Sequence, residues 1–185
     1  MRYALVIALL LPMSAFSLPA LAETCPPTDF AAADAERQPF FEALKSSETE
    51  RAGHLNAAEI WRRWQTAPDP AAQEMLNEGL RRIRSADYAG AEARLDELVA
   101  YCPDYPEGWN QRAFARFLAG NYDGALADLD RTLELEPRHF GALSGRGLTL
   151  LRQGRTHLGH QAIREAMRLH PFIQERRLLP DSQKI

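Results

Sequence analysis

Three prolines in the second half of the chain, Pro103, Pro137 and Pro171, follow one another at intervals of 34 residues. Proline has no N–H to donate and cannot continue a helix, so each of the three marks a helix end. Large and small side chains recur at the same spacing before each proline. The repeated columns are Met75, Trp109 and Leu143; Gly79, Ala113 and Gly147; Ala86, Gly120 and Gly154; Ala91, Ala125 and Gly159; and Leu95, Leu129 and Ile163. This period predicts a stack of similar helical units.

Small residues that alternate with large ones allow two antiparallel helices to approach closely. In the middle unit, the pattern predicts a first helix over residues 107–119 and a second over residues 122–135. Asn121 is placed to cap the second helix. The next unit has Arg155 at this position, so either Thr156 caps its second helix or that helix starts frayed.

The pattern resembles the tetratricopeptide repeat (TPR) family, whose 34-residue unit is a helix–turn–helix with large, small, alanine and proline positions in this order. The resemblance assigns three units, to residues 72–105, 106–139 and 140–173. It implies an all-α fold, an α-solenoid of antiparallel helix pairs. It also implies that the chain binds another protein and is not an enzyme.

Segments on both sides of the three units complete the predicted domain. Shifting the period back by one unit predicts a degenerate helical hairpin over residues 36–71, which would cover the exposed apolar end of the first unit. The alternative is an unrelated pair of helices. Residues 23–35 form an N-terminal arm, and residues 174–185 are expected to form a capping helix and tail over the last unit.

Residues 1–22 have the pattern of a secretory signal peptide. Arg2 precedes an apolar run over residues 4–11, and the small residues Ala20 and Ala22 fit a cleavage site after Ala22. An uncleaved membrane anchor is the alternative. We therefore expect a periplasmic or secreted protein with no stable membrane insertion after signal cleavage.

The two cysteines of the chain, Cys25 and Cys102, would reach an oxidising compartment if the chain is exported. One disulfide between them would tie the N-terminal arm to the middle of the domain. The alternative is a buried free Cys102 and a mobile arm, because the sequence does not show whether the two Cα atoms approach closely enough.

Two columns that are usually apolar in the family carry charge here. They hold Glu78, Arg112 and Arg146 in one column, and Arg82 and Arg116 in the other. An unpaired buried charge is costly, so we expect Glu78 to pair with Arg112, with Asp128 or Asp130 as further acceptors. The alternative is that the arginine stems lie along apolar surface with their charged ends in water.

The third unit contains five of the 11 glycines of the chain, and a glycine inside a helix costs up to about 1 kcal/mol relative to alanine. We expect this unit to be the least stable, with amides that exchange faster than those of the second unit. Its segment 141–147 resembles neither a nucleotide-binding loop nor a hydrolase turn, because the glycine spacing is wrong and no strand precedes it. Packing of small residues explains these glycines better.

Composition excludes several functions. A formal net charge of −3 gives no electrostatic reason to bind nucleic acid. No set of residues suggests a catalytic site, and no cofactor is implied. His157 and His160 lie one helical turn apart with Glu165 and His170 downstream, but no fixed third ligand is evident, so a solvated helix face is favoured over a metal site.

The first helices of stacked units line a concave surface, and the TPR resemblance places certain positions on that surface. Carried over to this chain, the predicted groove consists of Leu76, Leu80, Ile83, Arg84, Asn110, Phe114, Phe117, Leu118, Ser144, Leu148, Leu151 and Arg152. Such a groove suits an extended peptide or a helix, with Asn110 bonding its backbone and Phe114 filling a pocket. The alternative is that the chain covers the groove itself, through its N-terminal arm or a second copy.

Some family members grip a C-terminal carboxylate with Lys, Asn and Arg at set inward positions. Here the equivalent positions are Leu76, Leu80, Gln111, Gly141 and Gly145, so that clamp is missing. The leading hypothesis is an exported, non-enzymatic scaffold that binds an unidentified protein or peptide. The alternatives are a small periplasmic accessory protein with a metal-binding or enzymatic role, and a structural homo-oligomer.

Overall fold

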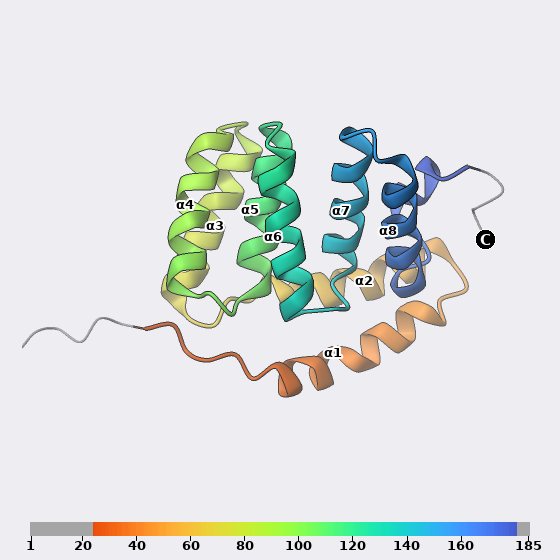
Figure 1. The fold of residues 1–185 in the computed structure, drawn as a ribbon. Helices are drawn as coiled ribbons and strands as arrows, with labels where there is room; N and C mark the ends of the chain where they lie inside the picture. Colours follow the sequence, from red (N-terminus) through yellow and green to blue (C-terminus); the bar gives the residue numbers. More distant parts are fainter. Residues whose placement is uncertain (1–23, 181–185) are drawn as a thin grey trace, which may run out of the picture.

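The computed structural model describes residues 24–180 of the chain, and this part is all-helical, without strands. Its elements are α1 (Phe30–Lys45), α2 (Glu50–Trp64), α3 (Pro70–Arg84), α4 (Tyr88–Tyr101), α5 (Pro106–Leu118), α6 (Tyr122–Leu135), α7 (Phe140–Arg152), α8 (Thr156–Leu169) and the 3-10 helix η1 (Gln174–Leu178). Helices α3 to α8 stand side by side as antiparallel pairs, while α1 and α2 lie across their lower ends (Figure 1). The predicted α-solenoid of helix pairs is therefore confirmed. The predicted signal peptide, residues 1–22, lies outside the described residues.

The turns between the two helices of each unit explain one of the repeated columns. Gly120 and Gly154 have positive φ angles of 83° and 75°, in the left-handed region that glycine adopts without strain. The first unit has Ala86 at this position, with a φ of 59°. A non-glycine residue in this region costs about 1–2 kcal/mol. The small-residue column is thus set by backbone geometry.

The second helix of each unit starts with a different cap. The Asp87 carboxylate accepts from the Gly90 N–H at 3.0 Å, and the Asn121 side chain accepts from the Gly124 N–H at 3.1 Å. Helix α8 has no side-chain cap, because Arg155 cannot accept and the Thr156 hydroxyl donates instead to the carbonyl oxygen of Gly154. The N-terminus of α8 therefore lacks one stabilising contact that α4 and α6 have.

The glycines of the third unit allow α7 and α8 to pack closely. A Cβ added to Gly147 would lie 2.6 Å from Cγ1 of Ile163, and one added to Gly159 would lie 2.9 Å from the carbonyl oxygen of Gly147. These distances are too short for an alanine without a shift of the helices. The glycines here serve packing, as the sequence predicted.

The N-terminal hairpin is present as α1 and α2, but the prediction that it covers the end of the first unit is wrong. It packs against the third unit through aromatic rings. Phe41 and Trp64 are buried against Phe140 of α7, with ring centroids 6.4 Å and 4.8 Å away, and Trp64 stacks on His139 at 3.8 Å. Burial of large aromatic surface against this ring cluster outweighs a continuation of the stack.

Buried polar groups join the hairpin to the array beside this cluster. Arg37 of α1 forms an ion pair with Glu136, and both side chains are less than one tenth exposed. The His139 Nδ1 accepts from the Ala142 N–H at 3.0 Å, which leaves the Nε2 to donate to Glu107, also at 3.0 Å. These contacts hold the hairpin in one position, although Arg37 Nε is buried without a hydrogen-bond partner within residues 24–180.

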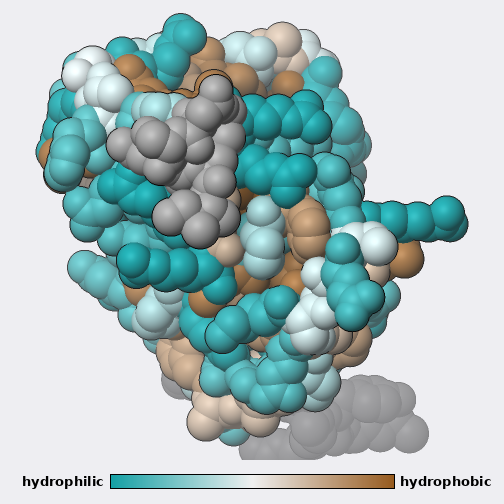
Figure 2. All heavy atoms as spheres, turned by 90° about the vertical axis from the view of Figure 1, so that its right-hand side faces the viewer, coloured by the Kyte–Doolittle hydropathy of each residue, from teal (hydrophilic) through white to brown (hydrophobic). Residues whose placement is uncertain are grey.

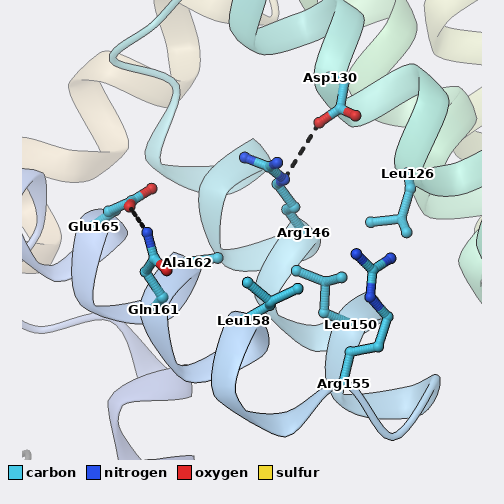
Figure 3. A pocket seen from close by; sticks show the side chains of 9 residues that line it. All are labelled: Leu126, Asp130, Arg146, Leu150, Arg155, Leu158, Gln161, Ala162 and Glu165. Atoms are coloured by element: carbon cyan, nitrogen blue, oxygen red, sulfur yellow. Dashed lines mark hydrogen bonds and ion pairs between the residues drawn. The ribbon is translucent and has the colours of Figure 1, made fainter.

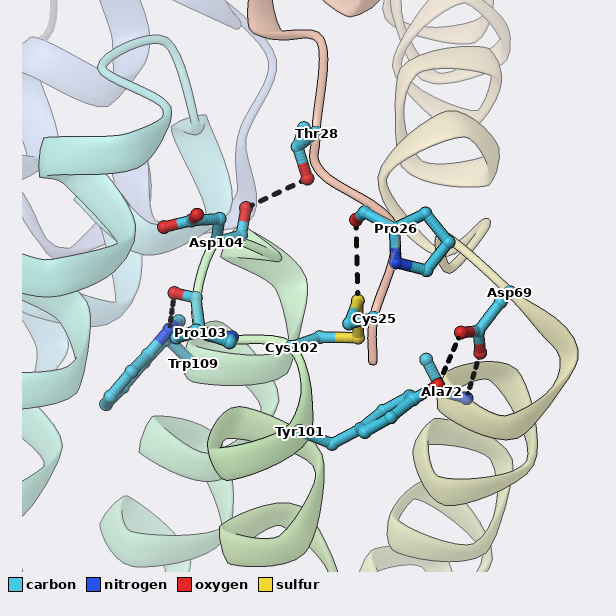
Figure 4. The surroundings of a disulfide bond; sticks show 10 residues. All are labelled: Cys25, Pro26, Thr28, Asp69, Ala72, Tyr101, Cys102, Pro103, Asp104 and Trp109. Atoms are coloured by element: carbon cyan, nitrogen blue, oxygen red, sulfur yellow. Dashed lines mark hydrogen bonds between the residues drawn. A yellow bond between two sulfur atoms is a disulfide. The ribbon is translucent and has the colours of Figure 1, made fainter. Parts of the chain in front are cut away.

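The N-terminal arm is tied to the first unit by a disulfide between Cys25 and Cys102, whose Cα atoms lie 5.2 Å apart (Figure 4). The Thr28 hydroxyl donates to the carbonyl oxygen of Asp104 at 3.3 Å. On the other side of the disulfide, the Tyr101 hydroxyl donates to Asp69, the residue that caps α3, at 2.8 Å. The arm therefore runs along the array and does not enter the predicted groove.

The C-terminal segment covers the last unit, and its helix is the short 3-10 helix η1. Ile173 and Leu179, on either side of η1, are buried against Leu143 and Ile163. On this side of the molecule the visible surface is mainly hydrophilic, with apolar residues in small areas between polar ones (Figure 2). Among residues 24–180, we find no helix with the length and hydrophobicity needed to cross a bilayer.

Candidate interaction groove

A cavity of about 310 Å³ lies between α2, α5, α7 and η1, and we call it the groove. It is lined by Trp61, Gln65, Asn110, Gln111, Ala113, Phe114, Phe117, Leu129, Gly141, Ser144, Gly145, Leu148, Thr149 and Glu175. Most of its wall is apolar or carries uncharged polar groups. This composition is typical of sites that bind apolar side chains and a few backbone groups.

The structure brings together part of the groove that the sequence predicted. The predicted residues that line it are Asn110, Phe114, Phe117, Ser144 and Leu148, all from the second and third units. The remaining predicted residues do not line it: Leu76, Leu80, Ile83, Arg84, Leu118, Leu151 and Arg152. The groove is therefore shorter than the repeat columns implied.

The first unit does not contribute because its inward positions are used for its own core. Leu76 is completely buried, and Leu80 and Ile83 pack against the same hydrophobic cluster. In the third unit, Leu151 packs against Gly159 of α8 and the core of that unit. These leucines stabilise the units, and Leu80 and Leu151 are only partly exposed.

The repeat columns did not predict the groove residues that lie outside the three units. Trp61 and Gln65 of α2 form one wall, and Glu175 belongs to η1. Trp61 fits because Gly141 has no side chain: a Cβ there would lie 2.4 Å from Cη2 of the indole. In the sequence, the one sign of this contact is that Gly141 has no side chain and that Trp61 has no place in the repeat columns. The two residues can be connected only when the tertiary structure is known.

Two amide side chains on α5 are held in place by one buried carboxylate. The Glu107 carboxylate accepts from Asn110 Nδ2 at 2.9 Å and from Gln111 Nε2 at 2.7 Å. No hydrogen bond within residues 24–180 uses the oxygen of either amide. Each oxygen can therefore accept an N–H from a bound peptide backbone.

Phe114 provides the exposed apolar anchor of the groove. Its side chain lies on α5 and is 47% exposed, while the neighbouring Phe117 packs against the Tyr122 ring at 5.7 Å. A large aromatic side chain that stays half exposed beside a cavity is a common feature of binding surfaces.

A second cavity of about 320 Å³ adjoins the groove and shares Trp61, Gly141, Ser144 and Glu175 with it. Beyond these shared residues it reaches His170, which ends α8. Burial, with the nearby His54 and Arg176, lowers the pKa of His170 to about 4. This histidine is therefore neutral at neutral pH.

The charged columns form a network that agrees with the prediction for Asp128, which accepts from Arg112, but not for Glu78. Arg112 does not pair with Glu78: it donates to Asp128 at 2.7 and 2.9 Å and to Asp96 at 2.7 Å. Glu78 pairs with Arg82 of its own helix, at 2.7 Å. The reason is that residues four apart on a helix meet directly, whereas Glu78 would have to reach across to another unit.

The buried charges of this network are stabilised by the oppositely charged side chains that they contact. Burial by itself would lower the pKa of Arg112, but the hydrogen bonds to Asp128 and Asp96 outweigh it, so the pKa is raised. Arg116 also donates to Asp128, at 2.8 Å, and to Glu92, at 2.7 Å. The side chain of Asp128 is 3% exposed, so it depends on both arginines.

A smaller cavity of about 150 Å³ lies between the second and third units, away from the groove (Figure 3). It is lined by Leu126, Asp130, Arg146, Leu150, Arg155, Leu158, Gln161, Ala162 and Glu165. Across it, Arg146 forms an ion pair with Asp130 at 3.3 Å. The further acceptor named from the sequence, Asp130, is thus used by the arginine of the next unit.

The histidines considered as metal ligands do not come together. His157 is exposed on α8, whereas His170 is buried beside His54 of the hairpin. Within residues 24–180, no three His, Cys, Asp or Glu side chains form a group that could hold a metal ion.

Comparison with known proteins identifies the repeat. A profile of the tetratricopeptide repeat matches residues 106–139, the middle unit of the array. The chain contains the tetratricopeptide repeat that its sequence pattern resembles. Its three TPR units are the pairs α3/α4, α5/α6 and α7/α8.

Two relatives share this repeat. A TPR repeat-containing protein of Rhizobium etli is 43% identical over 77 residues, which cover 42% of this chain and 38% of that protein. Tetratricopeptide repeat protein 36 of Xenopus tropicalis is 29% identical over 164 residues, with 84% of this chain and 79% of that protein covered. This chain thus spans well under half of the Rhizobium relative.

Solved structures of low sequence identity share the fold. The TPR2B domain of yeast Sti1, in a complex with pHsp70, has a TM-score of 0.55 at 18% identity, covering 61% of this chain and 92% of that one. A mutant of MamA has a TM-score of 0.50 at 16% identity, covering 77% of this chain and 98% of that one. At these identities the likeness concerns the fold alone.

Proposed function

We propose that this TPR protein is an exported, non-enzymatic scaffold that binds a peptide segment of a partner protein in the groove between α2, α5 and α7. The TPR fold supports a role in protein–protein interaction. The observation that carries the proposal is the half-exposed Phe114 beside two amide oxygens without partners in residues 24–180. An apolar anchor and backbone acceptors are what an extended peptide needs.

The amide side chains of the groove are held in position without a bound partner. Glu107 holds both amides, and His139 in turn holds Glu107, so their positions depend on buried contacts and not on solvent. A site whose side chains are already ordered loses less entropy on binding. This favours recognition of a specific segment.

The experiment compares two exposed apolar residues on different surfaces. Phe114 lines the groove at 47% exposure, whereas Leu158 is 42% exposed at the cavity between the second and third units. Tagged protein with Phe114→Ala should lose its partners in a pull-down from cell-envelope extract, while Leu158→Ala should keep them. Equal capture by both variants, with unchanged melting curves, would contradict the proposal.

Export is tested separately. We expect N-terminal sequencing of the protein from its native host to start at Glu23, in a periplasmic or secreted fraction. An intact Met1 in the cytoplasmic fraction would contradict export without affecting the groove. A molar mass that rises with concentration, and returns to one chain in Phe114→Ala, would instead place a second copy in the groove.

A further inference from the structure

The groove is lined almost entirely by uncharged residues. Among the described residues that line it, Glu175 is the one with a charged side chain. The same residue also lines the adjoining cavity, where the other titratable residues are His54 and His170. Of the residues that the two cavities share, Glu175 is therefore the one with a charged side chain.

Among residues 24–180, the Glu175 carboxylate has no counter-ion of its own. Within residues 24–180 no ion pair or hydrogen bond involves its side chain. The next residue, Arg176, is engaged elsewhere: it donates to the carbonyl oxygen of Pro171 and pairs with Glu50, each at 3.3 Å. A half-buried carboxylate without a cation is therefore left at the place where the two cavities meet.

Aromatic surface accompanies this carboxylate. Trp61 lines both cavities, and its indole is fixed edge-on to Trp64 and Phe140, with centroids 5.3 Å and 5.6 Å away. A carboxylate together with an aromatic ring is a favourable setting for a Lys or Arg side chain. A C-terminal carboxylate would meet repulsion here, since neither cavity is lined by Lys or Arg among the described residues.

We propose that the segment bound in the groove carries a Lys or Arg side chain among apolar residues, and that Glu175 is the counter-ion of this cation. This inference rests on the proposed function and adds the chemistry of the partner. The apolar side chains would contact Phe114 and Leu148, while the cation would reach the shared end of the two cavities.

The test is a selection of random nine-residue peptides displayed in a library against the immobilised full-length mature protein. We expect peptides from the unaltered protein to be enriched in Lys or Arg next to apolar residues. Glu175→Gln should lose the enrichment in basic residues while still selecting apolar ones. Glu175→Gln should keep the melting curve of the unaltered protein, because Glu175 has no partner in residues 24–180.

A synthetic peptide from that selection then gives the size of the effect. Replacing its basic residue by norleucine should weaken binding to the unaltered protein by at least about tenfold and binding to Glu175→Gln by less than about twofold. Peptides that depend on Phe114 but show no basic preference, or the same preference with Glu175→Gln, would overturn the inference and leave the proposed function standing. No selected peptide that depends on Phe114 would overturn both.

Discussion

The two junctions between the TPR units contain the same ion pair one repeat apart, yet they are built differently. Arg112 pairs with Asp96 at 2.7 Å between the first and second units, and Arg146 pairs with Asp130 at 3.3 Å between the second and third. At the first junction Asp128, Arg116 and Glu92 extend the pair into a network. The positions 34 residues later are Ala162, Leu150 and Leu126, which line the small cavity of Figure 3.

This difference shows what a repeat column does and does not determine. The column fixes where a side chain lies, but the residues around that side chain decide whether its charge is buried. Arg112 is 12% exposed against 41% for Arg146, so the first junction depends on complete pairing and the second depends little on its one ion pair.

Loss of one buried partner should have the largest effect. Arg112→Met removes the main cation next to Asp128, whose side chain is 3% exposed, and we expect a loss of about 3–5 kcal/mol in the free energy of unfolding. Urea unfolding followed by circular dichroism measures it. A loss below about 1 kcal/mol would mean that the network is effectively solvated.

Removing the disulfide should weaken the first unit alone. Cys102 ends α4, and its bond to Cys25 closes a loop with a sequence separation of 77 residues. The chain-entropy relation gives about 4.5 kcal/mol for a loop of this length. We expect a similar loss for Cys102→Ala, with hydrogen exchange rising first in the arm and α4. An unchanged midpoint after reduction of the unaltered protein would contradict this.

Converting the first junction into the second should cost less than breaking it. The variant Glu92→Leu/Arg116→Leu/Asp128→Ala removes acids and a base together and leaves the pair between Arg112 and Asp96. We expect a loss of at most about 2 kcal/mol, because no buried charge is left without a partner. If this variant is less stable than Arg112→Met, the comparison between the junctions is mistaken.

Lowering the pH should destabilise the protein through His170, which lies beside the third unit. The folded-state pKa of His170 is about 4, below its ordinary value of 6.5, because of burial and the nearby His54 and Arg176. The unfolded chain then binds a proton between pH 6.5 and pH 4 that the folded chain does not, so stability falls as the pH falls through this window. Glu50 is the acidic group that faces His54 and Arg176 here. His170→Gln should flatten the melting temperature over that range, whereas an unchanged slope would assign the effect to other groups.

The smallest effect is expected at the second junction. Arg146→Met breaks an exposed pair with Asp130, and we expect a change within about 0.5 kcal/mol. It is also the matched control for Arg112→Met, since both remove the same side chain from the same repeat column. A loss comparable to that of Arg112→Met would remove the distinction between the junctions.

Much of the array could be predicted from periodicity alone. The expected helices of the middle unit, residues 107–119 and 122–135, are found as Pro106–Leu118 and Tyr122–Leu135. Asn121 caps as expected. These features depend on neighbours along the chain, such as a cap, a proline or a glycine at a turn, and so they are visible in the sequence.

The groove could be predicted only in part. Asn110 and Phe114 lie on it as expected, because helix periodicity and the family's repeat geometry place them on the inner face. Leu76 does not, because the first unit buries it. Trp61 belongs to no repeat, and nothing local indicates that it would reach Gly141 on α7.

The sequence by itself therefore determined the helix pairs, their turns and the spacing of the units, since these follow from interactions within 34 residues of chain. Only the tertiary structure decided where the hairpin packs, which charges are buried and where the groove ends. Those outcomes depend on competition between distant surfaces: the rings of Phe41 and Trp64 pack against Phe140, in the third unit, and not on the end of the first unit. A competition of that kind is settled by packing in three dimensions, which a repeat pattern does not encode.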